Sequence, residues 1–413
     1  MEKKKLKLLP RLLIGIVAGI LLGSLGDWLG IKDSIGFQAF IKTVVTFTSL
    51  FSVFLNFIIP LLILTFVSVG LAELGKKANK LFGVTLLLAY LSTIIAGYSA
   101  FALGSAFLPK LIAKISGGAI TGSTFDAFFT IKADPIFGVM SALILAFVLG
   151  LGLANIKEGQ SLLDVLKDFR AVIAKVLSGV IIPIIPFYIA GTFCKIAAAG
   201  ELVPTVIMFA KLYVMILCFQ WIYILLQFSV ASLYRKENRF KDLKNILPAY
   251  FTALGTQSSA ATIPINLQCA ESNGLSDDVR NFVIPLCATI HLAGDTICLV
   301  LGAMGIMIAS GMTPTLAMFA PFILMLGVTM VAAPGVPGGG VMAALGIITS
   351  MLGFTDGMQE LIIALHLSQD SFGTACNITG DQAIAAIIDR VDEKAHIKEA
   401  SKAADSSADA MTD

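Results

Sequence analysis

The chain has 413 residues, of which 57% are hydrophobic and 14% charged. Soluble domains carry about 25% charged residues, so this composition excludes an ordinary soluble domain and indicates an integral membrane protein. The formal net charge of +2 points to no nucleic-acid partner. The six cysteines lie in apolar runs without Cys-x-x-Cys spacing, and we interpret them as small core side chains.

Six apolar runs of spanning length occupy the first part of the chain, because a membrane-crossing helix needs about 20 apolar residues. These runs are Leu12–Leu29, Phe37–Val69, Leu81–Leu108, Ile136–Ile156, Val172–Phe193 and Val206–Leu233. The basic N-terminus before the first run resembles the start of a signal peptide. No clear cleavage site of small residues follows it, so we interpret the run as a retained first helix.

Lysine and arginine gather in alternate loops between these runs. If the N-terminus lies inside, the inside loops carry the larger set, which is Lys76, Lys77, Lys80, Lys157, Lys167, Arg170, Arg235, Lys236, Arg239, Lys241 and Lys244. The outside loops carry Lys110, Lys114 and Lys132. Cytoplasmic loops of membrane proteins are enriched in Lys and Arg. The sequence therefore predicts cytoplasmic N- and C-termini in a multi-pass protein of a plasma-type (inner) membrane.

Two polar interruptions break later apolar stretches. They are TQSSAATIP at Thr256–Pro264 and APGVPGGG at Ala333–Gly340, and an apolar helix follows each one. A broken backbone is tolerated in the bilayer only where protein covers it or where it lines a wet cavity. Such pairs of interrupted segments mark the binding site of a transporter with inverted repeats. We therefore predict two re-entrant hairpins of opposite orientation.

The last apolar helix carries one polar stripe. Asp370, Thr374, Asn377 and Asp381 are spaced four, three and four residues apart, which places them on one helix face. Acidic side chains inside a membrane are costly, and they face a cation, a cationic ligand or water. A buried structural hydrogen-bond network is the alternative. The tail after this helix, from Asp389 to Asp413, is typical of a frayed cytoplasmic end.

The preceding helix carries polar groups at mid-length. An unwound turn between Thr289 and Asp295 would free backbone carbonyls for a cation. His291 could serve as a proton site, a hydrogen-bond donor or a packed neutral imidazole, and these alternatives stay open. His366 and His396 lie nearer the helix end and the tail, so the sequence assigns them no role.

The segments SSAATIP, IPLCATIHLAG, GVPGGG and QDSFGTACNITGD resemble the dicarboxylate/amino acid:cation symporter family, from Arg11 to Asp389, and most of all its sodium-coupled serine/threonine transporters. The resemblance implies an all-α integral membrane protein with the glutamate-transporter-like fold. That fold has eight transmembrane helices plus two re-entrant hairpins in inverted repeats. It also implies a homotrimer in the lipid bilayer, in which a transport domain moves like an elevator against a static scaffold.

The same resemblance implies a division of the chain. The scaffold comprises residues 1–73 as helices one and two and 114–200 as helices four and five. The transport domain comprises 74–113 as helix three, 201–240 as helix six, 241–278 as the first hairpin, 279–312 as helix seven, 313–356 as the second hairpin and 357–392 as helix eight. Residues 393–413 form a cytoplasmic tail.

Site residues follow from the resemblance as well. The implied substrate contacts are Ser258, Ser259, Asp295, Val336, Gly340, Asp370, Thr374 and Asn377. One sodium site is implied around Asp381 and the carbonyls of Cys287, His291 and Asn377, a second around Thr289 and the carbonyls of Met330, Val331 and Ala333, and a third around Tyr90 and Thr93. Sodium is the expected coupling ion, and proton coupling stays open.

Three departures from the family pattern bear on the substrate. His291 and Ala293 replace the Asn and Asp of the third sodium site, Gly373 replaces the Arg that holds a side-chain carboxylate, and Asp295 replaces a Thr that faces the substrate. A dicarboxylate would meet one more negative charge and no guanidinium. We therefore expect a symporter for a small neutral, serine- or threonine-like amino acid.

Four alternative functions compete with this expectation. Within the class they are a proton-linked carrier for a cationic or other amino acid, and a dicarboxylate symporter. Outside it they are a gated channel and an intramembrane hydrolase built from Ser258, His291 and Asp295. The hydrolase is disfavoured because those side chains belong to segments suited to ligand closure, so we do not expect an enzyme.

Overall fold

The computed structural model describes residues 8–75, 80–112, 125–156, 158–236, 238–334 and 336–409. Every regular element in these residues is helical, as the sequence predicts. Among the residues named above, Lys76, Lys77, Lys114 and Lys157 lie outside the described part, as do residues 1–7 and 410–413 of the predicted N-terminus and tail.

The helices follow one another along the chain as α1 (Leu8–Trp28), α2 (Ile35–Gly75), α3 (Lys80–Leu111), α5 (Val139–Asn155), α6 (Gln160–Val176), the π-helical turn η1 (Leu177–Ile181), α7 (Ile182–Ala198), α8 (Leu202–Arg235), α9 (Arg239–Thr256), α10 (Ser259–Ser272), α11 (Asp277–Ile290), α12 (Ala293–Ala309), α13 (Leu316–Val331), α14 (Gly339–Leu352) and α15 (Asp356–Asp409). Within the described residues, six helical stretches are long and apolar enough to cross a membrane.

Two helical stretches extend more than ten residues beyond the apolar runs that predict them. The stretch α6–η1–α7 begins at Gln160, although the apolar run starts only at Val172. Its first turns are amphipathic, with Leu163 and Leu166 buried and with charged residues at Asp164, Lys167 and Asp168, so a search for continuous apolar residues misses them. Helix α15 continues to Asp409, through residues for which the sequence predicts a frayed tail. Ala, Lys and Glu in that segment favour the helix.

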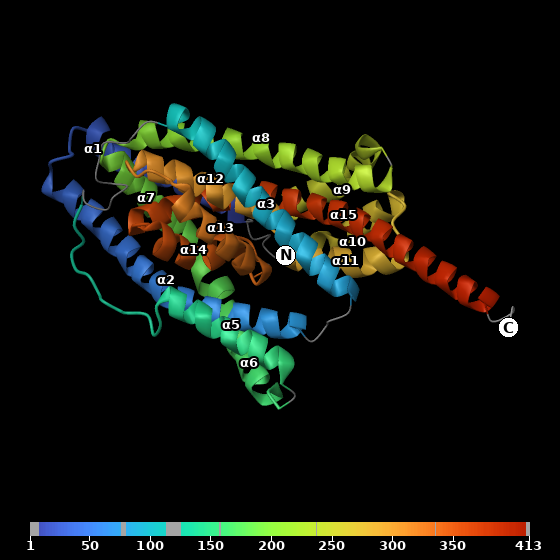
Figure 1. Cartoon of the computed structure of the whole chain (residues 1–413). Coiled ribbons are helices and arrows are strands. Elements are labelled where there is room, and N and C mark those ends of the chain that lie inside the picture. Colours follow the sequence, from blue (N-terminus) through green and yellow to red (C-terminus); the bar gives the residue numbers. More distant parts are fainter. Residues whose placement is uncertain are drawn as a thin grey trace, which may run out of the picture.

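The helices form two groups (Figure 1). Helices α1, α2, α5, α6 and α7 pack on one another, while α3, α8, α11, α12 and α15 form the second group. Within the first group α1 lies directly on the α7 backbone. A Cβ atom at Gly19 would come within 2.1 Å of the carbonyl oxygen of Ala190, so the small residues of α1 permit a contact that no larger residue allows.

Two helix pairs complete the second group. The pair α9–α10 packs mainly on α8, α11 and α15, at the end of the molecule away from α1, α2 and α7 (Figure 1). The pair α13–α14 packs on α3 and α12, and it also contacts α2 and α5 of the first group. An ion pair links the groups as well, because Lys195 Nζ on α7 lies 2.7 Å from the carboxylate of Glu360 on α15.

Candidate functional site

The tips of the two helix pairs meet at a small cavity of about 80 Å³. Its wall is completed by the break between α11 and α12 and by the middle of α15. The residues that line it include all eight of the expected substrate contacts, namely Ser258, Ser259, Asp295, Val336, Gly340, Asp370, Thr374 and Asn377. Thr289 and Ala333, expected near sodium, line it too. Segments far apart in the chain thus converge on one site.

The first tip presents the start of helix α10 to the cavity. Gln257 takes a left-handed backbone conformation with φ 55°, which turns the chain into α10. Ser258 then caps the helix, and its Oγ accepts a hydrogen bond of 3.3 Å from the N–H of Ala261. The first N–H groups of a helix lack intrahelical partners, and the helix dipole adds partial positive charge there. This end of the cavity therefore suits an anion such as a carboxylate.

The second tip is tied to Asp370. Gly338 has φ 75°, a conformation that favours glycine, and its N–H donates to Asp370 Oδ2 at 3.2 Å. A Cβ atom at Gly339 would lie 1.9 Å from the carbonyl oxygen of Pro334, so only glycine permits this tight turn. Asp370 Oδ1 has no hydrogen-bond partner among the described residues, and the carboxylate lines the cavity. Asp370 can therefore accept a further donor from a ligand.

The sequence predicts an unwound turn before Asp295, and the structure has it at His291 and Leu292, between α11 and α12. Asn377 fixes the turn from α15. Its Oδ1 accepts from the N–H of Gly294 at 2.7 Å, and its Nδ2 donates to Asp295 Oδ2 at 2.6 Å. The side-chain amide of Asn377 is thus engaged at both ends, and it holds the carboxylate of Asp295 at the cavity wall.

His366 belongs to the site although the sequence assigns it no role. Its Nε2 donates to Asp295 Oδ1 at 2.8 Å, and both side chains are buried. Asp295, His366 and Asp370 each place a side-chain N or O atom within 4.8 Å of the other two. The signal that could have found it is helical spacing, because His366 lies four residues before Asp370 on the same face of α15.

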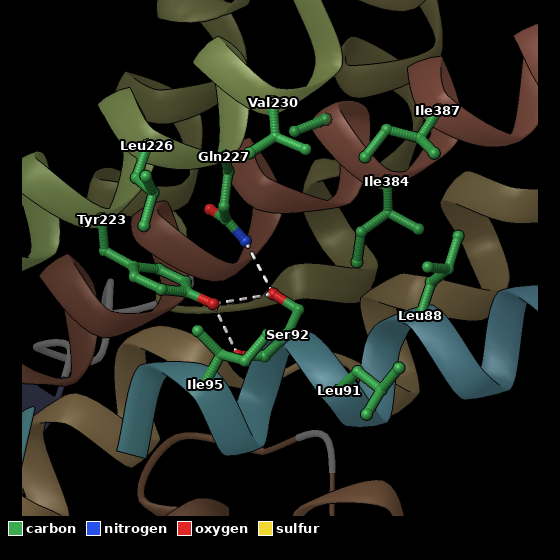
Figure 2. Close-up of a pocket in the computed structure, with 11 residues that line it drawn as sticks. Leu88, Leu91, Ser92, Ile95, Tyr223, Leu226, Gln227, Val230, Ile384 and Ile387 are labelled. Carbon is green, nitrogen blue, oxygen red and sulfur yellow. Dashed lines mark hydrogen bonds between the residues drawn. The ribbon is translucent and has the colours of Figure 1, made fainter. Parts of the chain in front are cut away.

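A second buried cluster lies beyond the cavity wall. His291 Nδ1 lies 2.9 Å from Asp381 Oδ1, and its Nε2 lies 3.0 Å from Ser92 Oγ on α3. Figure 2 shows Ser92 hydrogen-bonded to Tyr223 and Gln227 of α8, and these three residues are among those that line a largely apolar pocket. Gln227 Nε2 donates to Ser92 Oγ, so the Ser92 hydroxyl can donate to His291. This assignment makes Nδ1–H the donor to Asp381.

Among the residues expected to hold sodium, Asp381 has an oxygen that a cation could engage. Its second oxygen, Oδ2, is buried and has no hydrogen-bond partner among the described residues. A buried carboxylate oxygen of this kind needs a donor or a cation, and hard cations prefer such oxygen ligands. Cys287 lies one turn before the helix break, and its carbonyl accepts from the N–H of His291 at 2.8 Å.

The other expected sodium residues are arranged differently. Met330 and Val331 end helix α13, and the Met330 carbonyl accepts from Ala333 at 3.2 Å. Tyr90 donates to the Leu324 carbonyl, and Thr93 donates to the Ala89 carbonyl of its own helix. The hydroxyls of Tyr90 and Thr93 therefore bond elsewhere, and it is Ser92 on α3 that reaches the His291–Asp381 pair.

Comparison with known proteins identifies the class. The sequence model of the sodium:dicarboxylate symporter family matches residues 8–391. The chain therefore belongs to this family of membrane symporters.

Particular relatives differ in how much of their length they share with the chain. An excitatory amino acid transporter of Caenorhabditis elegans is 27% identical over 68% of this chain and 57% of its own length. The chain spans about half the length of such relatives, 54% of a bovine neutral amino acid transporter A and 47% of an Ambystoma tigrinum excitatory transporter. The serine/threonine transporter SstT of Acinetobacter baumannii is 26% identical over 93% of this chain and 97% of its own length. The SstT protein of Streptococcus suis is 30% identical over 71% and 81%.

Proposed function

We propose that this protein is a secondary active symporter that takes up a small neutral amino acid together with sodium. The observation that carries the proposal is the cavity at which both helix-pair tips, the broken helix and α15 converge. Membership of the sodium:dicarboxylate symporter family supports the transport class. The serine/threonine transporter relatives, which align over nearly their whole length, support a neutral substrate.

The substrate lies between opposite charges in this proposal. Asp370 holds the ammonium group through a charge-assisted hydrogen bond. The start of α10 at Ser258 and Ser259 receives the carboxylate, and Thr374 Oγ1, which donates its hydrogen to the Asp370 carbonyl, accepts from the ammonium group. The side chain of the substrate then points toward Asp295, while Val336 and Gly340 cover it from the second tip. No Lys or Arg is among the described residues that line the cavity, so a second carboxylate on the substrate would have no cationic partner.

Sodium binds at Asp381 in this proposal. The buried Oδ2 of Asp381 is the anchoring ligand, and carbonyls at the end of α11 are within the same region of the fold. The ion supplies the positive charge that this acid needs inside the membrane. Asn377 bonds to Asp295 and to the turn at Gly294, and it lies one helical turn before Asp381 on α15. Sodium at Asp381 and substrate in the cavity therefore contact the same segment of this helix.

Transport occurs by an elevator movement of the second group of helices against the first. We take the eight membrane-spanning helices, the two re-entrant hairpins, the homotrimer and the domain limits given above as parts of this proposal. The cavity adjoins a cleft of about 310 Å³ that is lined by Gly70, Glu73 and Arg170 as well as by Thr289 and Ala333. With the N-terminus in the cytoplasm, Gly70 and Glu73 lie near the cytoplasmic end of α2. The structure then corresponds to the inward-facing state.

The test is uptake of radiolabelled amino acids by the purified protein in liposomes, with a sodium or a proton gradient imposed separately. We expect a sodium gradient to drive saturable accumulation of serine or threonine, and aspartate to compete poorly. Accumulation driven by protons alone would contradict sodium coupling. Potent competition by aspartate would contradict the neutral substrate, and flux without accumulation would indicate a channel.

A further inference from the structure

The pair of Asp295 and His366 forms the cavity wall opposite Asp370. Asp295 Oδ1 accepts from His366 Nε2 at 2.8 Å, and Asp295 Oδ2 accepts from Asn377 at 2.6 Å. His366 does not line the cavity itself, and only 1% of its surface is exposed. It therefore reaches a ligand only through Asp295.

Two glycines keep this pair within reach of a ligand. A Cβ atom on Gly340, at the second tip, or on Gly373, on α15, would lie 3.3 Å from Asp295 Oδ1. Side chains at these two positions would cover the oxygen that His366 holds. Each carboxylate oxygen can accept more than one hydrogen bond, so Asp295 can accept a donor from a substrate side chain while it keeps both of its present partners.

The charges around the cavity are unequal. Asp295 and Asp370 both line it, and an amino-acid substrate brings one ammonium group, which pairs with Asp370. Asp295 would remain as a second buried carboxylate, and a buried charge without a partner is strongly unfavourable. Such a carboxylate would select substrates with a second positive charge. His366 is the basic side chain that the described structure places against it.

We propose that His366 is a positioning residue whose Nε2–H hydrogen bond to Asp295 makes the side-chain end of the cavity selective for neutral hydroxyl side chains over cationic ones. The proposal rests on the proposed function and adds the determinant of substrate selectivity to it. The hydrogen bond reduces the negative potential of Asp295 while leaving one acceptor site for a hydroxyl. Without it, a positively charged side chain is the better partner for Asp295.

The experiment compares homoserine with 2,4-diaminobutyrate, its amine counterpart of similar length, as competitors for sodium-driven threonine uptake. The ratio of the two inhibition constants is the readout, because a general loss of folding or activity does not change it. In the wild type we expect homoserine to bind about tenfold more tightly or better. In His366→Leu, which removes the donor, we expect the ratio to shift by about tenfold toward 2,4-diaminobutyrate.

Two further variants control this result. His366→Gln retains an amide donor, and its ratio is expected to stay within about threefold of the wild-type ratio. Asp295→Asn combined with His366→Leu removes the carboxylate, and the shift toward 2,4-diaminobutyrate is expected to disappear. An unchanged ratio in His366→Leu, or a Gln variant that shifts as far as the Leu variant, would overturn the proposal.

The outcome stays decisive if His366→Leu does not insert. The wild-type ratio then decides by itself, since equal affinity or a preference for 2,4-diaminobutyrate contradicts a wall that favours neutral side chains. Failure of the proposed function has a different signature. In that case the wild type accumulates no amino acid under a sodium gradient, whatever the ratio of competitors.

Discussion

Two buried His–Asp pairs join the broken helix to α15, and they differ in what surrounds the acid of each pair. Asp295 on α12 pairs with His366 on α15 at 2.8 Å, while His291 in the helix break pairs with Asp381 on α15 at 2.9 Å. The first acid lines the cavity, and both of its oxygens have partners. The second acid does not line it, and one of its oxygens has no partner among the described residues.

This difference shows that surroundings determine what the same pair of side chains can do. An acid at the cavity wall can discriminate between substrates, because a ligand in the cavity reaches it. An acid behind the wall with an unpartnered oxygen is suited to a cation that the substrate does not touch. His291 is also held by a polar relay through Ser92 to α3 and α8, whereas His366 has no partner for its Nδ1 in the described residues.

The largest effect is expected at Asp370, the acid of the cavity that has no His partner of its own. Asp370→Asn removes the charge that holds the substrate ammonium group, and loss of one member of a buried charged pair costs about 2–5 kcal/mol. We expect substrate affinity to fall by about 30-fold or more, with insertion into the membrane unchanged. Binding of labelled threonine to purified protein measures this, and near-normal affinity would contradict the role.

Asp381→Ala distinguishes the role of the His291–Asp381 pair in sodium binding from the role of the Asp295–His366 pair in substrate selection. We expect the sodium concentration for half-maximal uptake to rise by about 100-fold, because the variant loses an anchoring ligand and its charge. The ranking of competing amino acids should stay as in the wild type. Sodium titrations of uptake, with the competitor panel repeated at saturating sodium, check both parts. An altered ranking with unaltered sodium dependence would reverse the assignment of the two pairs.

Asp295→Thr is the reciprocal change. It restores the residue type that the resemblance leads one to expect and removes the carboxylate from the cavity wall. We expect the ranking of serine, threonine, lysine and ornithine to change by about tenfold, with sodium dependence unaltered. The same competitor panel measures this. If neither the ranking nor the sodium response moves, Asp295 has no part in selectivity.

The smallest effect is expected at Ser92, which touches the His291–Asp381 pair and not the cavity. Ser92→Ala removes one hydrogen bond to His291, worth about 1 kcal/mol. Sodium affinity should fall by about threefold to tenfold, without a change in substrate ranking. Thr93→Ala is the matched control, because the Thr93 hydroxyl bonds to a carbonyl of its own helix. Equal effects of the two variants would contradict the relay.

The sequence predicts much of this arrangement because breaks and polar residues in apolar segments are conspicuous. The tips at Ser258 and Gly340, the turn at His291 and the face of α15 with Asp370 all follow from local pattern. The helical start at Gln160 is missed because charged residues on one face of this amphipathic segment interrupt the continuous apolar run. The roles of Ser92 and His366 are missed for another reason. Their partners lie 199 and 71 residues away in the chain, and only the packing of helices brings them together.

The ion pair between Lys195 and Glu360 has a consequence for the rate of transport. It joins α7, in the proposed static scaffold, to α15, in the proposed moving domain, and Glu360 is only 3% exposed. An elevator movement separates these helices, so the pair must break in every cycle. Separating the pair leaves the buried carboxylate of Glu360 without its partner, which is unfavourable, and this cost lengthens the time spent in the state with the pair formed. The exchange of charges, Lys195→Glu with Glu360→Lys, should preserve that dwell time, whereas Glu360→Gln should shorten it. Single-molecule fluorescence between labels on the two helix groups would record the difference as a change in lifetime.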